Sequence, residues 1–374
     1  MEKRNKTCQA PPKEALFRPE VSKNVESAAV LASTQDSVEF CVYDVGLTIA
    51  SASPELLENL ARDFHYFAGP APPQKVSIEA TLGRPPWERI PVQFASQITP
   101  NAVIYDSGNV RFNDYQHEAL AIYDFSKEEG QVWSENPDLL YEITYLLCLS
   151  RIGEIHDLHR IHRVHALGIA VGKSGALILL PESGGKSTLC MQMLRHPEVR
   201  LLSDDTPLIS RGKLYPFPTR LGIRNTRAVG IDPQYLRTMR RRNREPKTLL
   251  DVRYFQDRIA SEAIPYALIV GARRNGDDSW IEPISAVKAF PALVSSLVFG
   301  LGLPQVVEFF LRGGSADFMR KFSIVAFRLA AVVSLLRRAK CYRLALGRDT
   351  SMAAEAVMSV LRARIQYEAG DTPS

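Results

Sequence analysis

The sequence predicts an α/β protein, α+β overall, in which a β-rich N-terminal domain precedes a domain with a phosphate-binding P-loop. Two observations carry this prediction. Short β-type segments separated by turn residues fill the first half of the chain. After residue 160 an apolar segment, a Gly-Ser loop, a helical segment and another apolar segment follow in turn, as is typical of an α/β core that binds nucleotide. We expect a disordered tail over 1–36, the β-rich domain over 37–155 and the P-loop domain, helical toward its end, over 156–374.

Composition limits the class of protein and its partners. A chain of 374 residues with 45% hydrophobic content can bury one large core or two ordinary ones. The net charge of +5 is too small to indicate nucleic acid, and we expect no such partner. Five cysteines without CxxC spacing indicate reduced thiols in a cytoplasmic protein. The charged first twenty residues contain no apolar segment of a secretory signal, so we expect none.

Residues 37–155 have the pattern of a sheet with two helices. Ser53-Pro54 and Asn136-Pro137 each put proline at a first helical position, which predicts that helices begin there. Glycine and polar residues predict hairpin turns at 107–109 and 127–130. No catalytic motif stands out in this half. Strands are expected within 38–51 and over 75–82, 102–106, 110–114, 119–125 and 131–134.

The second half begins with two apolar strands around a turn at 172–175. A helix over 186–196 and a strand that ends near 203 are expected to follow. A strand at 341–347 and a helix from Thr350 complete the predicted fold.

Two long apolar segments, 289–311 and 318–340, lie near the end of the chain. Proline interrupts the first and Arg328 the second, whereas a membrane span needs about 20 clean residues. We therefore favour burial in the core over contact with a membrane surface, and a true span is the least favoured interpretation. Surface contact draws its support from basic residues in and beside the second segment: Arg320, Lys321, Arg337, Arg338 and Lys340.

The stretch Gly184-Gly185-Lys186-Ser187 indicates a nucleotide site. Amides of a glycine-rich turn, and the positive end of the helix that follows, attract phosphate. Lys186 would supply a mobile charge to the β- and γ-phosphates, and Ser187 a hydroxyl to Mg²⁺. Leu180 stands where the common loop has its first glycine, so this loop is expected to enter by a different path. A turn with a chance lysine is the weaker alternative.

An acidic pair, Asp204 and Asp205, follows the apolar segment 199–203. One acid at a strand end can hold Mg²⁺ while the other accepts a proton from an attacking hydroxyl. The alternative is a turn in which one aspartate caps the chain.

With these motifs, the sequence resembles the catalytic domain of HPr kinase/phosphorylase and its kinase-like relatives, including those found in peptide-modifying gene clusters. His165 precedes Lys186 by 21 residues and Asp204 follows it by 18, both close to the spacings of that family. The stretches "LILLPESGGKSTL" and "RLLSDDTPLI" carry most of the resemblance, which covers residues 160–225 and not 1–155. Members of this group often assemble as homo-oligomers.

The resemblance implies a role for each matching residue. Asp204 would be the base, with His165 beside it and Lys186 on the phosphates. Ser187 and Asp205 would serve Mg²⁺. A further carboxylate motif of the family (Glu-Ile-Arg-Gly) and its phosphorolysis motif are not recognisable, so the resemblance favours a kinase without the reverse activity. ATP would be bound along Ser183, Gly184, Gly185, Lys186, Ser187 and Thr188.

Two further groups of residues are candidates. His156, His159, His162 and His165 recur every third residue, which suggests zinc. We favour a polar linker from which only His165 enters the site. The basic run 237–247 is interpreted as a loop that grips phosphate or an acidic peptide, or as a solvated surface. Arg220 is a candidate phosphate or substrate contact.

The expected activity is ATP- and Mg²⁺-dependent transfer of the γ-phosphoryl group to a Ser or Thr hydroxyl of a peptide or small protein, such as a biosynthetic precursor peptide. Alternatives are a kinase of a free small molecule, an ATP-dependent carboxykinase-like enzyme and a non-catalytic nucleotide-binding regulator. A membrane-associated scaffold with a vestigial loop is a further alternative.

Overall fold

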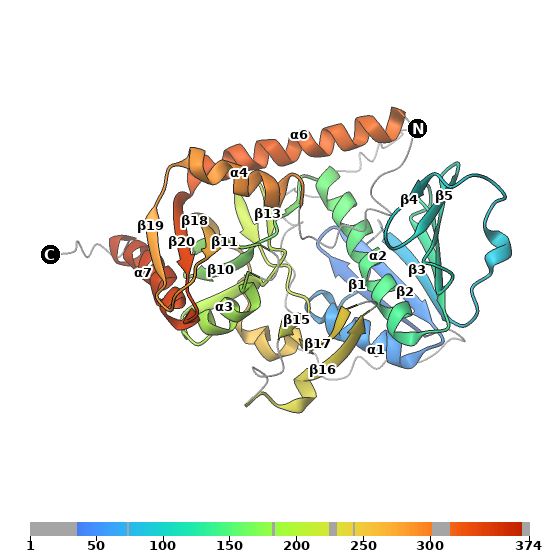
Figure 1. Ribbon diagram of the computed structural model, residues 1–374, viewed down its shortest axis with the longest axis horizontal. Coiled ribbons are helices and arrows are strands. Elements are labelled where there is room, and N and C mark those ends of the chain that lie inside the picture. The colour runs from blue at the N-terminus through green and yellow to red at the C-terminus, as the bar shows by residue number, and fades with distance from the viewer. Residues whose placement is uncertain are drawn as a thin grey trace, which may run out of the picture.

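The computed structural model describes residues 36–72, 75–181, 184–223, 230–241, 244–300 and 315–368. Figure 1 shows a mixed α/β protein in which one large sheet lies at the right and a second, with helices on both faces, lies at the left. The long helix α6 crosses the top of this view above both parts. Both large sheets combine parallel and antiparallel pairs, so the predicted α/β class is confirmed at this level.

Eight strands among the described residues form the N-terminal sheet, in the order β1-β2-β3-β8-β7-β6-β5-β4. The pairs β2–β3 and β3–β8 are parallel, whereas the others are antiparallel. The strands expected after residue 70 are confirmed to within two residues. The bounds are β1 Asp36–Val42, β2 Val45–Ser51, β3 Lys75–Leu82, β4 Gln97–Ile98, β5 Val103–Ser107, β6 Val110–Asp114, β7 Ala119–Asp124 and β8 Glu129–Ser134.

The β-type stretch 38–51 is a hairpin whose strands β1 and β2 pair in register, with Val42 opposite Val45. Tyr43 at the turn has a φ of +59°, a left-handed conformation that reverses the chain. Asp44 is the one residue of 43–44 that favours a turn, since neither glycine nor proline stands there. The pairing of the flanking strands sets the position of the turn.

Helices α1 (Pro54–Asp63) and α2 (Pro137–Leu158) begin where the sequence predicts. The Ser53 hydroxyl accepts a hydrogen bond from the amide of Leu56, and the Asn136 side chain caps α2 in the same way. Helix α2 is buried along nearly its whole length because it contacts α1 and the large sheet, and also β16 and α6. The expected division at residue 155 falls in the last turn of α2.

The second large sheet has the order β12-β10-β11-β18-β20-β19, and its pairs β11–β18 and β18–β20 are parallel. Side chains of β11 alternate: Ile178 packs with helices α3 and α7, whereas Leu177 and Leu179 pack with α4 and α6. The bounds are β10 Leu167–Val171, β11 Ser174–Leu179, α3 Lys186–Met193, β12 Val199–Ser203, β18 Ile264–Arg273, β19 Trp280–Pro283, α4 Ala286–Leu297, α6 Ser315–Arg338, β20 Lys340–Leu346 and α7 Thr350–Glu368.

Several expectations for this half need correction. The predicted helix 186–196 ends at Met193, where Leu194 caps it. The apolar segment 289–311 contributes to α4 up to Leu297, and residues 301–311 lie outside the described ranges. In the ranges that the structure describes, no helix combines the length and the apolarity that a membrane crossing requires.

Two small sheets complete the fold, with strand orders β14-β13-β9 and β15-β17-β16. The basic run 237–247 was expected to be a loop, but most of it forms the antiparallel pair β16–β17. Short 3₁₀ helices lie at His65–Phe67, Trp87–Arg89, Pro233–Tyr235 and Val252–Arg258. The remaining strands are β9 His162–Arg163, β13 Leu208–Ser210, β14 Lys213–Tyr215, β15 Leu221–Ile223, β16 Leu236–Arg241 and β17 Arg244–Leu250.

A buried carboxylate, Asp63 at the end of α1, joins the two parts of the chain. It accepts hydrogen bonds from Arg220 (3.0 Å to Nη1), from Arg237 and from the Tyr141 hydroxyl. The Asp63 side chain is fully buried, and only 12% of Arg220 and 14% of Arg237 is exposed. The solvated-surface interpretation of the basic run is therefore wrong at Arg237.

Replacing Asp63 by alanine should lower the free energy of unfolding by ~3–5 kcal/mol, because it leaves two nearly buried guanidinium groups without their carboxylate. Urea denaturation followed by circular dichroism measures this loss. The exposed pair of Lys213 and Glu262 is the control, since Glu262→Ala should cost less than ~1 kcal/mol. Similar losses for the two variants would contradict the central role of Asp63.

Candidate phosphate-binding site

The loop between β11 and α3 is shaped by two glycines. Gly185 has a φ of +102° and precedes the first residue of α3, a conformation that glycine adopts without strain. The amide of Gly184 donates to the Pro181 carbonyl (2.9 Å), and a Cβ at Gly184 would stand 2.8 Å from that oxygen. Among the described residues no side chain caps the start of α3. Ser183, a predicted phosphate contact, lies outside the described residues, whereas Ser187 and Thr188 are half-buried in the first turn of α3.

Leu180, the main departure from the common loop sequence, points into the core. Its side chain is only 4% exposed and lies against Gly271 of the neighbouring strand β18. A Cβ at Gly271 would stand 2.5 Å from Leu180 Cδ2, so glycine at 271 makes the room that leucine at 180 occupies. The Leu180 carbonyl faces the site and accepts a hydrogen bond from Lys186 Nζ (3.1 Å). The Leu180 side chain therefore packs in the core, and its carbonyl is the part that contacts Lys186.

Lys186, His165 and Asp205 meet at one point. Lys186 Nζ lies 2.7 Å from His165 Nε2 and 3.5 Å from Asp205 Oδ1, and His165 Nε2 lies 3.0 Å from the same Asp205 oxygen. The three residues come from α3, from the segment before β10 and from the turn after β12. The structure thus brings together three of the residues that the sequence predicts for the site.

The imidazole of His165 cannot serve both neighbours through Nε2 with one proton. If Nε2 carries hydrogen, it donates to Asp205, whereas a bare Nε2 accepts from the Lys186 ammonium. The Lys186 side chain is only 10% exposed, so its ammonium depends on Asp205, His165 and the Leu180 carbonyl for partners. The Asp205 side chain is 40% exposed. An anion that entered here would compete with Asp205 for Lys186.

Backbone contacts fix the acidic pair beside His165. The Ser203 hydroxyl accepts a hydrogen bond from the amide of Thr206 (3.0 Å), which forms the turn that carries both aspartates. The amide of Ala166 donates to the Asp205 carbonyl (3.1 Å) and so aligns the two segments. Together these contacts hold the acidic turn against the start of β10. The side chain that caps the turn amides is Ser203, not one of the two aspartates as the alternative interpretation expected.

The two aspartates differ in their ionisation. Burial and the neighbouring charge of Asp205 raise the pKa of Asp204 to about 7, although Lys247 and Lys186 oppose the rise. Burial also acts against ionisation of Asp205, but the hydrogen bond and charge of His165, with the two lysines, outweigh it and lower the pKa of Asp205. Asp205 is therefore the carboxylate that stays charged next to Lys186.

Sequence reasoning did not single out two basic residues of the site. Lys247 of β17, noted only as part of the basic run, acts on both aspartates. The Lys247 side chain passes directly over Gly222. A Cβ at position 222 would stand 2.0 Å from Lys247 Nζ, so glycine leaves room for the lysine. The guanidinium of Arg273, the last residue of β18, lies against Gly185. A Cβ built on Gly185 would stand 3.1 Å from Arg273 Nη2. No local signal marks Arg273, because only the parallel pairing of β11 and β18 brings it to the loop.

Arg220 lies between the N-terminal helices and the acidic pair. Besides its contact with Asp63, its guanidinium stands 3.6 Å from the centre of the Tyr145 ring. The charge of Asp204 in turn contributes to a raised pKa of Tyr145, mainly the result of burial. The contacts that the described residues give Arg220 are with α1 and α2, and the structure does not bring it to the phosphate loop.

The polar-linker interpretation of the four histidines is wrong, because three of them are buried in α2, β9 and the segment after it. His156 Nε2 contacts the Val42 carbonyl (3.0 Å), and His162 Nδ1 contacts Asp157 (2.8 Å). His159 pairs with Asp44. Across the described part of the chain, no three or more His, Cys, Asp or Glu residues group as metal ligands.

Comparison with known proteins adds no assignment. No model of a known protein family matches the chain, and no curated protein is significantly similar to it. Functional inference therefore depends on the geometry of the site and on its motifs.

Asp204→Asn should stabilise the nucleotide- and metal-free protein above about pH 7 and change little near pH 4. The folded state holds a proton on Asp204 up to a pKa of about 7, against an ordinary value of 3.8. Stability from this group is therefore complete below about pH 4 and is lost as the pH rises through 7. Asparagine does not ionise, so the loss disappears, and thermal unfolding across this range measures the difference in Tm.

The exposed Asp257→Asn variant is the control, and its Tm should follow the wild-type curve at every pH. Parallel curves for Asp204→Asn and the wild type would show that Asp204 ionises normally in the folded protein.

Proposed function

We propose that this protein is an ATP- and Mg²⁺-dependent kinase that transfers the γ-phosphoryl group to a hydroxyl. The observation that carries the proposal is the meeting of Lys186, at the start of a helix after a Gly-Gly turn, with Asp205 and His165. An ammonium, a charged carboxylate and an uncapped helix start are the parts that phosphoryl transfer requires. The resemblance of residues 160–225 to HPr-kinase-like proteins supports the same assignment.

The phosphates would bind along the loop and the first turn of α3. Gly184 and Gly185 allow close approach of the backbone, and the amides of Lys186, Ser187 and Thr188 lie at the positive end of the helix. Lys186 would exchange Asp205 for phosphate oxygens. Arg273 adds a second positive charge beside Gly185.

The donor atoms at the site fit Mg²⁺. The Ser187 hydroxyl and the partly exposed Asp205 carboxylate are oxygen ligands, and Mg²⁺ commonly takes one or two protein ligands together with phosphates and water. When bound, the ion would neutralise charge on the phosphates during transfer. The lowered pKa of Asp205 keeps this carboxylate charged and so suits it to the role.

Asp204 is the candidate base. Among the described residues no side chain forms a hydrogen bond or ion pair with its carboxylate, because His165 and Lys186 contact Asp205 instead. In the proposed step the acceptor hydroxyl gives its proton to Asp204 while its oxygen bonds to the γ-phosphorus. The bond from that phosphorus to the bridging oxygen breaks, and ADP leaves.

The proposed acceptor is a Ser or Thr residue of a peptide or small protein. A free hydroxyl compound is the alternative substrate, and a nucleotide-binding regulator is the alternative without catalysis. These alternatives differ in one measurable respect, since only a kinase moves label from ATP to an acceptor.

Transfer of labelled γ-phosphate to a panel of peptides and small hydroxyl compounds, with ATP affinity from calorimetry, tests the proposal. Asp204→Asn should keep ATP affinity within about threefold and reduce transfer by ~10²–10⁴-fold, because it removes only the base. Lys186→Ala should weaken both. Lys173→Ala, on the exposed turn between β10 and β11, is the matched control and should change neither. Failure of the wild type to bind ATP would refute the proposal, and binding without transfer to any acceptor would favour the regulator.

Arg273→Ala should weaken ATP binding about tenfold while ADP binding changes less, because a guanidinium beside the loop acts most strongly on the most charged ligand. The neighbouring Arg274→Ala is the control, since it carries the same charge loss one residue beyond β18. Equal effects of the two substitutions would mean that only overall charge matters and that Arg273 has no specific contact.

A further inference from the structure

Helix α6 exposes apolar side chains and buries charged ones. From 318 to 333 every exposed position is apolar, and the charged residues lie on the other side. Arg328 is 2% exposed and pairs with Asp157 of α2 (3.0 Å from Nε), and Lys321 pairs with Glu154 (2.8 Å). A helix on a water-facing surface normally shows the opposite arrangement. The expectation that the segment 318–340 is buried in the core is therefore wrong for this outer face.

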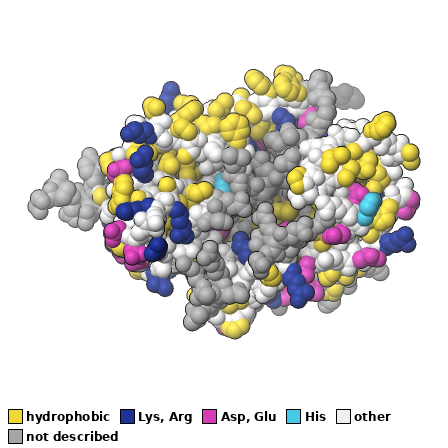
Figure 2. All heavy atoms as spheres, in the orientation of Figure 1, with side chains coloured by type: hydrophobic (Ala, Val, Ile, Leu, Met, Phe, Trp, Pro, Cys, Tyr) yellow, Lys and Arg dark blue, Asp and Glu magenta, His cyan; other side chains and the backbone are white. Residues whose placement is uncertain are grey.

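The outer face is large and continuous. Phe318, Phe322, Val325, Leu329 and Val333 recur at helical spacing, and each is 39–69% exposed. They span the 16 residues from 318 to 333, or about 22 Å along the helix axis from the first Cα to the last. Figure 2 shows hydrophobic side chains along the upper edge of the molecule, where α6 and α4 lie side by side. Helix α4 adds two further apolar side chains, Val287 (81% exposed) and Phe290 (44% exposed).

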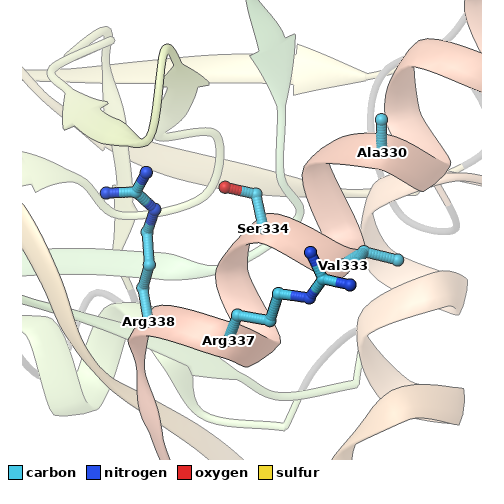
Figure 3. A pocket seen from close by; sticks show the side chains of 5 residues that line it. All are labelled: Ala330, Val333, Ser334, Arg337 and Arg338. Carbon is cyan, nitrogen blue, oxygen red and sulfur yellow. The ribbon is translucent and has the colours of Figure 1, made fainter.

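Basic residues lie at the C-terminal end of this face. An open depression of about 610 Å³ lies there, and the side chains that line it, shown in Figure 3, are Ala330, Val333, Ser334, Arg337 and Arg338. The two guanidinium groups lie on either side of Ser334 in this view. Arg338 also packs on the turn at Gly212, where a Cβ would stand 2.9 Å from Cζ. Two arginines next to an apolar wall suit a phosphate that is attached to a hydrocarbon chain.

Charge distinguishes a bilayer from a second copy of the chain as the occupant. The exposed charged residues of α4 and α6 are Lys288, Arg337 and Arg338, and the one acid within these two helices, Asp317, lies at the opposite end from the arginines. Antiparallel pairing of two α6 helices would set both arginines against Phe318 and Met319. Parallel pairing would set arginine against arginine. An anionic bilayer satisfies both the apolar face and its basic end.

We propose that the outer face of α6, with Val287 and Phe290 of α4, binds the surface of an anionic membrane. The helix lies in the plane of the bilayer surface, its apolar side chains enter the headgroup–acyl boundary, and Arg337 and Arg338 bind lipid phosphate. The contact is peripheral. It does not depend on the kinase proposal, because none of these residues belongs to the phosphate site.

Flotation of the full-length protein with vesicles, without nucleotide, tests this inference. The wild type should float with vesicles of phosphatidylcholine mixed with phosphatidylglycerol, and much less with phosphatidylcholine alone. Phe322→Glu should reduce the fraction bound at least tenfold, because it puts a charge in the apolar face. The pair Arg337→Gln and Arg338→Gln should weaken binding about 25-fold, at about fivefold for each basic residue.

Phe94→Glu is the matched control, because Phe94 is 98% exposed and lies before β4, outside α4 and α6. It should bind as the wild type does, and the Tm of each variant verifies folding. A wild type that stays with neither kind of vesicle, or Phe322→Glu that binds unchanged, overturns the proposal. The proposal also fails if the wild type is a dimer that binds no vesicles and Phe322→Glu converts it to a monomer, since a second copy would then cover the face.

Discussion

A nearly buried ammonium requires a negative partner, and the site depends on how Lys186 meets that requirement. Without phosphate the partners are Asp205, His165 and the Leu180 carbonyl; the first two lie about 20 residues away in sequence, and Leu180 lies six residues before Lys186. Lys186 lowers the pKa of both aspartates, so it does not by itself account for their difference. The hydrogen bond and charge of His165 help to keep Asp205 charged, whereas burial and the charge of Asp205 raise the pKa of Asp204.

Three glycines allow the backbone and side chains around Lys186 to take up this arrangement. Gly185 permits the left-handed turn into α3, and Gly271 on the adjacent strand makes room for Leu180. Gly222 likewise gives Lys247 its path toward the aspartates. A leucine in a phosphate loop looks like a defect in sequence alone, whereas in the structure it completes the core beneath the loop. Its side chain and its carbonyl serve different purposes, the first for packing and the second as a partner of Lys186.

Buried charges also connect the parts of the molecule. Asp63 binds arginines from β16 and from the segment before β15, and Asp157 of α2 binds Arg328 of α6 and His162. Because such pairs tolerate little separation, they fix α1, α2 and α6 relative to the site. On α6, between 318 and 333, the charged residues face inward and the exposed residues are apolar, and that apolar side is the face we assign to a membrane.

Local signals in the sequence determined much of the secondary structure. Proline after a capping residue marked α1 and α2, alternation marked most strands of the large sheet, and the Gly-Gly-Lys-Ser stretch marked the start of α3. The Gly-Gly-Lys-Ser stretch indicated Lys186, the apolar segment before them indicated Asp204 and Asp205, and a resemblance in spacing added His165. The hairpin at Tyr43, the strands within the basic run and the burial of the histidines were missed, because each depends on what another segment places alongside. Tertiary structure alone decided that Arg273 reaches the loop, that Arg220 contacts Asp63 and that Lys321 and Arg328 of α6 face inward. The physical reason is that a side chain's own chemistry is written in the sequence, whereas its partner and its exposure to water are set by segments far along the chain.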